Sequence, residues 1–274
     1  MSAVLALAGG ELRQAARSRA VVVGGLVLAA SATGISVLGG SAADGLGTAS
    51  LDTTTAALLQ VSVLLPPLLA LVLGAGSLAG SRERGFLGMI AAQPVRRWSL
   101  VGAAYCGLAS ALGLVLAFGF GFSALALVSG GSAGALAGLA VLAAVSVGAT
   151  AAALAAGLAI SAWSRGQAEA TGAAVGTWFA FSLGYDLVLA ATVPAVDPSL
   201  GMTFLAIAVN PLEAARLLGL LLLDGGSATL GSLGVYLVDR LGVVAAAGIC
   251  ITSLVVWTVA GLSLATIALQ RRDL

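Results

Sequence analysis

The chain has 274 residues, of which 60% are hydrophobic and 8% are charged, and its net charge is +1. A soluble domain carries about 25% charged residues, so this composition is typical of a protein embedded in a lipid bilayer. The near-neutral net charge excludes the basic surface that a nucleic acid partner would require.

All twelve basic residues are arginines, and the chain contains no Lys and no His. A phosphate-binding P-loop requires a lysine, and the Ser-His-Asp and Cys-His nucleophilic sites require a histidine. We therefore expect no ATPase motif, no enzymatic activity and no resident cofactor or metal. Cys106 and Cys250 lie in apolar segments, where we interpret them as small hydrophobic side chains rather than a disulfide or metal pair.

Six apolar segments each have the roughly twenty residues that a helix needs to cross a bilayer. They are Ala20–Gly40, Ala56–Gly80, Ser99–Val128, Gly134–Ala162, Thr171–Val193 and Leu241–Ala268. None shows the alternation of a transmembrane β-barrel, so each must satisfy its backbone groups as a helix. The pattern predicts an all-α, polytopic membrane protein with six transmembrane helices and one domain over residues 1–274.

Arginine placement predicts the orientation of these spans. Ten arginines fall on one side of a six-span chain: Arg13, Arg17, Arg19, Arg82, Arg84, Arg96, Arg97, Arg165, Arg271 and Arg272. Arg216 and Arg240 fall on the other. Because cytoplasmic loops carry the excess of basic residues, we expect both termini in the cytoplasm and a location in the bacterial inner membrane.

Two further elements are predicted outside the six spans. Residues 1–19, with polar side chains over Glu11–Arg17, are typical of a short amphipathic helix on the inner membrane surface. Residues 197–240 contain a second apolar stretch, Met202–Leu223, interrupted by Pro211 and by charges. If that stretch crossed the bilayer, the terminal arginines would move outside. We therefore expect an outer re-entrant helical hairpin, packed against protein.

Two features lie within predicted spans. Asp186 is a carboxylate in the outer part of the fifth span, where a charge is costly. It is either a polar contact in an outward-facing cavity or a partner for Arg216, or simply a carboxylate that reaches the interface or a neighbouring helix. Pro66 and Pro67 remove hydrogen bonds from the second span and predict a kink there.

The densest polar cluster lies in the loop over residues 81–98. Its arginines could serve only as topological anchors. The order of charged, apolar and Gln-Pro residues is, however, typical of a short amphipathic helix that docks on a soluble partner and ends at a proline turn. The candidate contacts are Arg82, Glu83, Arg84, Gly85, Gln93 and Pro94.

These motifs resemble those of ABC-2 type transporter permeases. The resemblance rests on Glu83 with Gly85, the run Ala92–Arg97 before the return into the membrane, Glu11–Arg13 before the first span, and Asn210–Leu212 between the last two. It implies a homodimer that works with two copies of a cytoplasmic ABC ATPase, which bind Mg-ATP. The loop over residues 81–98 would then transmit their closure to the spans.

A narrower resemblance lies in Gly172–Phe181 and Asp186–Leu189, together with Asn210-Pro211 and Ala215–Leu217. These segments are similar to NosY-type permeases of the transporter that helps mature nitrous oxide reductase. This implies a periplasmic β-helical partner that handles copper or sulfur. Because the chain has no His, two Cys and three Met, we expect it not to pass bare copper ions, but to export a small species or relay motion.

Three alternatives compete with this interpretation. An ABC-2 exporter of drugs, lipids or glycans would share the same spans. An ATP-independent secondary transporter usually shows inverted repeats and several intramembrane charges, which the sequence lacks. Gly184-Tyr185-Asp186 contains half of an intramembrane aspartyl protease signature, but no Gly-x-Gly-Asp occurs in another span.

Overall fold

The protein was analysed as a computed structural model that describes residues 9–10, 21–31, 33–34, 48–85, 97–129, 135–196, 198–224 and 230–271. Within these ranges the regular structure is helical and no strand is present, which confirms the all-α prediction. Five helical segments are long and apolar enough to cross a membrane, and a sixth is added if one bent pair counts as a single span.

The helices follow the predicted spans closely. Their bounds are α3 Thr48–Glu83, α5 Arg97–Ser129, α6 Leu136–Trp163, α7 Gln167–Phe179, the π-helix η2 Ala180–Gly184, α8 Tyr185–Val196, α9 Leu200–Val209, α10 Pro211–Asp224, α11 Gly231–Tyr236, the π-helix η3 Leu237–Leu241 and α12 Val243–Arg271. An apolar helix over Val21–Ser31 belongs to the first predicted span. The structure does not describe most of residues 32–40, which complete that span. It also does not describe most of residues 1–19 or residues 86–96.

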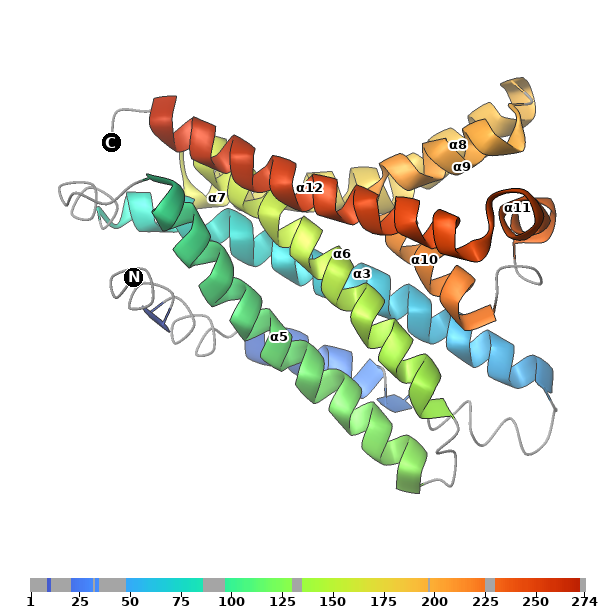
Figure 1. Cartoon of the computed structure of the whole chain (residues 1–274). Helices are drawn as coiled ribbons and strands as arrows, with labels where there is room; N and C mark the ends of the chain where they lie inside the picture. The colour runs from blue at the N-terminus through green and yellow to red at the C-terminus, as the bar shows by residue number, and fades with distance from the viewer. Residues whose placement is uncertain are drawn as a thin grey trace.

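Helix α6 lies at the centre of the bundle, in contact with α3, α5, α7, α10 and α12 (Figure 1). Small residues let α3 and α6 approach closely: a Cβ atom on Gly157 would lie 2.6 Å from the Leu71 carbonyl oxygen, and one on Gly74 would lie 2.8 Å from that of Leu154. The Ser161 hydroxyl donates to the Ala75 carbonyl. Close backbone approach through small residues is how transmembrane helices associate in the absence of a hydrophobic driving force.

Helix α3 continues as one helix through Pro66 and Pro67, and the kink there stays a prediction. Pro66 has no N–H to offer the Ser62 carbonyl four residues earlier. The hydroxyl of Ser146 on α6 donates to that carbonyl at 2.9 Å. The indole N–H of Trp178 on α7 donates to the Leu64 carbonyl, one turn before the second proline, at 3.1 Å. Side chains of two neighbouring helices therefore stabilise the proline segment.

The two ends of the bundle differ in charge. The end of α3, the start of α5, the junction of α6 with α7 and the end of α12 lie at one end (Figure 1). These segments carry Arg82, Arg84, Arg97, Arg165 and Arg271. The structure thus gathers the described arginines of the predicted inner side; that this end faces the cytoplasm stays a prediction.

At the opposite half, α9 and α10 form the bent pair, with an angle of 118° between them at Asn210. Such a bend fits a re-entrant element or a broken span, and it occurs inside the predicted region 197–240. Helices α8 and α9 extend away from the bundle (Figure 1). Their surfaces are apolar, with Leu187, Val188, Met202 and Leu205 more than half exposed.

Candidate functional site

Glu83, at the end of α3, binds the start of another helix. Its carboxylate accepts a hydrogen bond from the Gln167 backbone N–H at 2.8 Å. Helix α7 begins at Gln167, and its N-cap residue Gly166 supplies no side-chain cap. Because the first N–H groups of a helix are unpaired and carry partial positive charge, Glu83 serves as the missing cap from a separate helix.

The same junction holds Arg82. Its guanidinium donates to the Ser164 carbonyl oxygen at 2.7 Å, between the end of α6 and the start of α7. A Cβ atom on Gly166 would lie 2.5 Å from the Glu83 carboxylate oxygen, so a side chain there would displace the cap. Two adjacent side chains of α3 thus join it to the α6–α7 junction.

Arg84 and Gly85 follow Glu83 at the end of α3. Arg84 is exposed, and Gly85 ends the helix with a φ of +71°, a left-handed conformation that glycine adopts readily. On the far side of the loop, the Arg97 guanidinium donates to the Leu269 carbonyl of α12. Gln93 and Pro94 lie outside the described residues. The described residues on both sides of the segment 86–96 are therefore bound to the bundle, through Glu83 and Arg82 before it and Arg97 after it.

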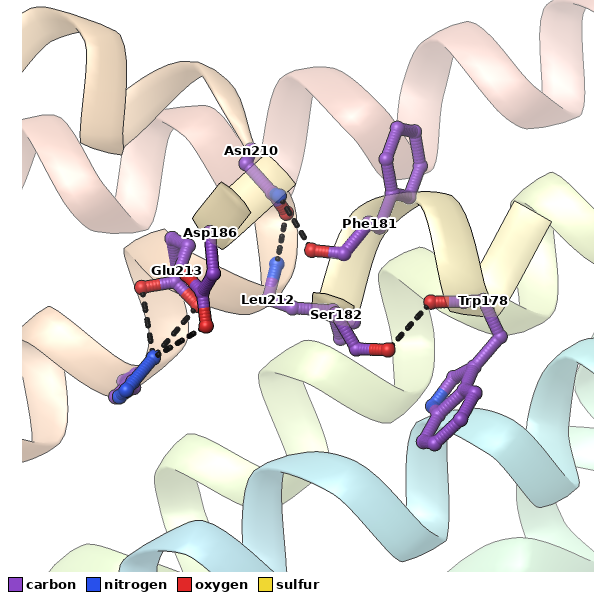
Figure 2. Close-up of polar contacts among 8 residues, drawn as sticks. Trp178, Phe181, Ser182, Asp186, Asn210, Leu212 and Glu213 are labelled. Atoms are coloured by element: carbon purple, nitrogen blue, oxygen red, sulfur yellow. Dashed lines mark hydrogen bonds and ion pairs between the residues drawn. The ribbon is translucent and has the colours of Figure 1, made fainter. Parts of the chain in front are cut away.

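A cluster of three charges lies in the other half of the bundle (Figure 2). Arg216 Nη1 lies 2.9 Å from Glu213 Oε1 and 3.5 Å from Asp186 Oδ2. The Glu213 side chain is 13% exposed and that of Asp186 is 42% exposed. The predicted pairing of Asp186 with Arg216 is thus present, but Glu213, which the sequence analysis did not assign, is the nearer and more buried partner.

The three charges line one wall of a cavity of about 450 Å³. The other described walls come from α3, with Leu59 and Gln60, and from Ile207 of α9. Asp186 therefore lines a cavity and contacts Arg216 on a neighbouring helix; that this cavity faces outward stays a prediction. The cluster thus contains one basic and two acidic side chains.

Asn210 joins this region to the π-helix η2. It is 2% exposed, its amide donates to the Phe181 carbonyl at 2.7 Å, and its side-chain oxygen accepts from the Leu212 N–H at 2.9 Å (Figure 2). A π-helical turn disrupts the i to i−4 ladder, so a carbonyl there needs another donor. The asparagine followed by Pro211 has the sequence of a helix N-cap with proline at the first position, a signal that would have identified its role.

Two aromatic side chains also bind the region of the bend between α9 and α10. The Tyr185 hydroxyl donates to the Ala206 carbonyl, and the Trp257 indole donates to the Val209 carbonyl at 2.8 Å. Trp257 also contacts Phe181, with ring centroids 5.2 Å apart in an edge-to-face arrangement. Side chains of α8 and α12 therefore bind carbonyl groups of α9 next to its bend with α10.

Comparison with known proteins identifies the family. The sequence profile of ABC-2 family transporter proteins matches residues 5–274. The chain belongs to the ABC-2 family of transporters. It is 31% identical over 241 residues to the probable ABC transporter permease protein NosY of Stutzerimonas stutzeri, covering 85% of this chain and 87% of the relative. It is 30% identical over 240 residues to the NosY of Pseudomonas aeruginosa, covering 83% and 85%.

As an ABC-2 permease, the chain is a multi-pass transmembrane subunit of an ABC transporter of the bacterial inner membrane. ATP hydrolysis in such a transporter belongs to a separate subunit, so an ATPase partner is implied. The family resemblance and its NosY-like character, both stated from sequence motifs, are confirmed.

Proposed function

We propose that this permease couples to its ATPase through the segment between Gly85 and Arg97, and that its helices pass the resulting displacement to the opposite half of the bundle. The supporting observation is the tie between the end of α3 and the start of α7, made by the Glu83 carboxylate and the Gln167 N–H at 2.8 Å. A force on the segment after Gly85 reaches α3 first, and this cap passes it to α7.

The path from that cap leads to the charge cluster. Helix α7 continues through η2 into α8, which begins with Tyr185 and Asp186. A tilt of α7 therefore changes the position of Asp186 relative to Arg216 on α10. Motion by rigid bodies joined at a few hinge residues is a common form of transporter transition. In this proposal Asn210 and η2 are the hinge.

We further propose that the transporter serves the maturation of nitrous oxide reductase, as a dimer with two ATPase subunits and a periplasmic β-helical protein that handles copper or sulfur. Its support is the identity to two NosY permeases over most of both chains. The chain has no histidine and two cysteines, which favours export of a small species, or relay of motion, over passage of bare copper ions.

The docking proposal is tested on the permease co-expressed with its ATPase subunit. We expect Arg84→Glu, which reverses an exposed charge, to weaken ATPase copurification about tenfold or more. Glu83→Ala should leave docking intact but lower the permease-dependent part of the ATPase rate, since it removes the cap on α7. Arg240→Glu, which reverses an exposed arginine of η3 just before α12, is the matched control. A Glu83→Ala, Arg84→Ala double variant with full assembly and an unchanged ATPase rate would contradict the proposal.

The biological role is tested by complementation of a strain that lacks its own NosY. We expect this chain, expressed with its ATPase and periplasmic partner, to restore the copper content and activity of nitrous oxide reductase. A reductase that stays inactive, together with a gain of drug or glycan export, would assign the chain to the general exporters instead.

A further inference from the structure

A groove of about 440 Å³ lies between α5 and α12, at the arginine-bearing end of the bundle and apart from the charge cluster. Its lining from α5 includes Trp98, Val101 and Gly102, and that from α12 includes Ser263, Thr266 and Ile267. Among its described lining residues there is no Asp and no Glu.

Arginines lie beyond one end of the groove, and its lining is mainly apolar, with polar side chains of Ser263 and Thr266 on the α12 wall. Arg97 precedes the first lining residue of α5 and crosses to the end of α12, where its guanidinium donates to the Leu269 carbonyl. Arg271 is exposed at the end of α12. With a helix rise of 1.5 Å per residue, the lining residues lie within about 14 Å of these arginines, along the direction of the helices.

We propose that this groove binds an anionic phospholipid, with its phosphate against Arg97 and Arg271 and one acyl chain along the wall formed by Val101, Gly102 and Ile267. Guanidinium groups form strong charge-assisted hydrogen bonds with phosphate, and basic pockets between transmembrane helices bind anionic head groups. Trp98 is 59% exposed and is the second residue of α5, a place near the end of a span where tryptophan side chains commonly anchor a membrane protein. The proposal is independent of the transported cargo.

The charge pattern favours a lipid over a second copy of the chain. If two copies packed through this face about a two-fold axis, Arg97 and Arg271 would approach their own equivalents, and like charges so placed repel. A phospholipid carries negative charge at its head group and hydrocarbon below it. This order matches the arginines at one end of the groove and the mainly apolar lining that follows.

The test uses the full-length chain, purified in detergent and depleted of lipid, with its thermal unfolding midpoint as the readout. Phosphatidylglycerol should raise the midpoint in a saturable manner, because a ligand that binds the native state stabilises it. Phosphatidylcholine and glycerol 3-phosphate should each raise it much less, since one lacks the net negative charge and the other lacks acyl chains. Equal shifts with either compound would overturn the proposal.

Two variants with matched controls locate the site. A Cβ atom on Gly102 would meet no atom within 4 Å, so Gly102→Leu fills the groove without disturbing packing and should abolish the shift. Gly113→Leu, an equally open position on α5, should retain it. Arg271→Gln should weaken phosphatidylglycerol binding about fivefold, and Arg240→Gln should not.

Two results would reject the lipid site. One is an undiminished phosphatidylglycerol shift in Gly102→Leu. The other is a Gly102→Leu chain whose mass in solution falls to that of a monomer while the parent is a dimer, because the groove would then be a protein interface.

Discussion

The contact between α3 and α6 and the joint between α8, α9 and α10 are built in opposite ways. The first is made by backbone against backbone through Gly74 and Gly157, with serine hydroxyls between the helices. The second is made by side chains of Asn210, Tyr185 and Trp257 that donate to backbone carbonyls of other helices. The two regions also differ in burial. In an apolar 18-residue stretch of α6, 56% is buried, against 11% in the corresponding stretch of the span that contains α7 and α8.

This difference indicates which parts of the permease move together. Close-packed backbones have few alternative arrangements, so α3 and α6 should move as one rigid unit. Side-chain hydrogen bonds around a π-helical turn can be broken and remade at modest cost, and such turns occur frequently at functional sites. We therefore expect the arm formed by α8 and α9 to change its orientation relative to the α3–α6 unit.

The largest expected effect is in the rigid unit. In Gly157→Leu the new side chain would meet the backbone of α3 at Leu71, which cannot move aside as a flexible side chain does. Overpacking usually costs 1–3 kcal/mol, and with backbone as the obstacle we expect a loss above about 3 kcal/mol and little folded protein in detergent. The control is Gly113→Leu, where a Cβ atom would meet no atom within 4 Å. A Gly157→Leu chain as stable as this control would mean that the helices are not closely packed.

A smaller loss is expected at the joint. Asn210→Ala removes the cap of α10 and leaves the Phe181 carbonyl without its amide donor, which should lower the free energy of unfolding by about 2–3 kcal/mol. Ser199→Ala is the control, because Ser199 caps α9 from an exposed position at 3.4 Å and should cost about 0.5–1 kcal/mol. Unfolding in detergent measures both. Equal losses in the two variants would contradict a special role for Asn210.

The sequence predicts the rigid unit better than the joint. The requirement for about twenty apolar residues per span places a helix directly: residues 134–162 were expected for α6, and the helix covers Leu136–Trp163. The bend at Asn210 was also foreseeable, since charges and Pro211 interrupt an apolar run. The local sequence pattern is therefore sufficient to predict a helix where the bilayer fixes its required length and apolar character.

The remainder depends on contacts between distant residues. The π-helix η2 has no local sequence signal, and the Phe181 carbonyl finds its donor in Asn210, 29 residues later. Glu83 binds a backbone group 84 residues away, and no residue pattern marks that group. Glu213 is different: it lies three residues before Arg216 on one helix, a spacing at which side chains meet, so the local sequence could have indicated this pair. Only the fold brings Asp186 to the same arginine.

A third variant tests the serine contacts inside the rigid unit. Ser146→Ala leaves the Ser62 carbonyl, already deprived of a backbone donor by Pro66, without the hydroxyl of α6. Hydrogen bonds between transmembrane helices average about 0.6 kcal/mol with a maximum near 1.7, so we expect a loss of about 1 kcal/mol in unfolding experiments. Ser110→Ala removes an exposed bond within α5 and should change nothing measurable. A loss at Ser110 as large as at Ser146 would show that helix-to-helix bonding is not the cause.

The smallest effect is expected from the charges that connect the arm to α10. Double-mutant cycles isolate each pair, one from Arg216→Gln with Glu213→Gln and the other from Arg216→Gln with Asp186→Asn. The Glu213 pair is short and shielded, whereas Asp186 is 42% exposed and 3.5 Å away, so its coupling energy should stay below about 0.5 kcal/mol. A weak Asp186 pair lets α8 swing without a large electrostatic cost. If its coupling instead exceeds that of Glu213, the charge locks the arm to α10, and the two regions of the molecule would move as one.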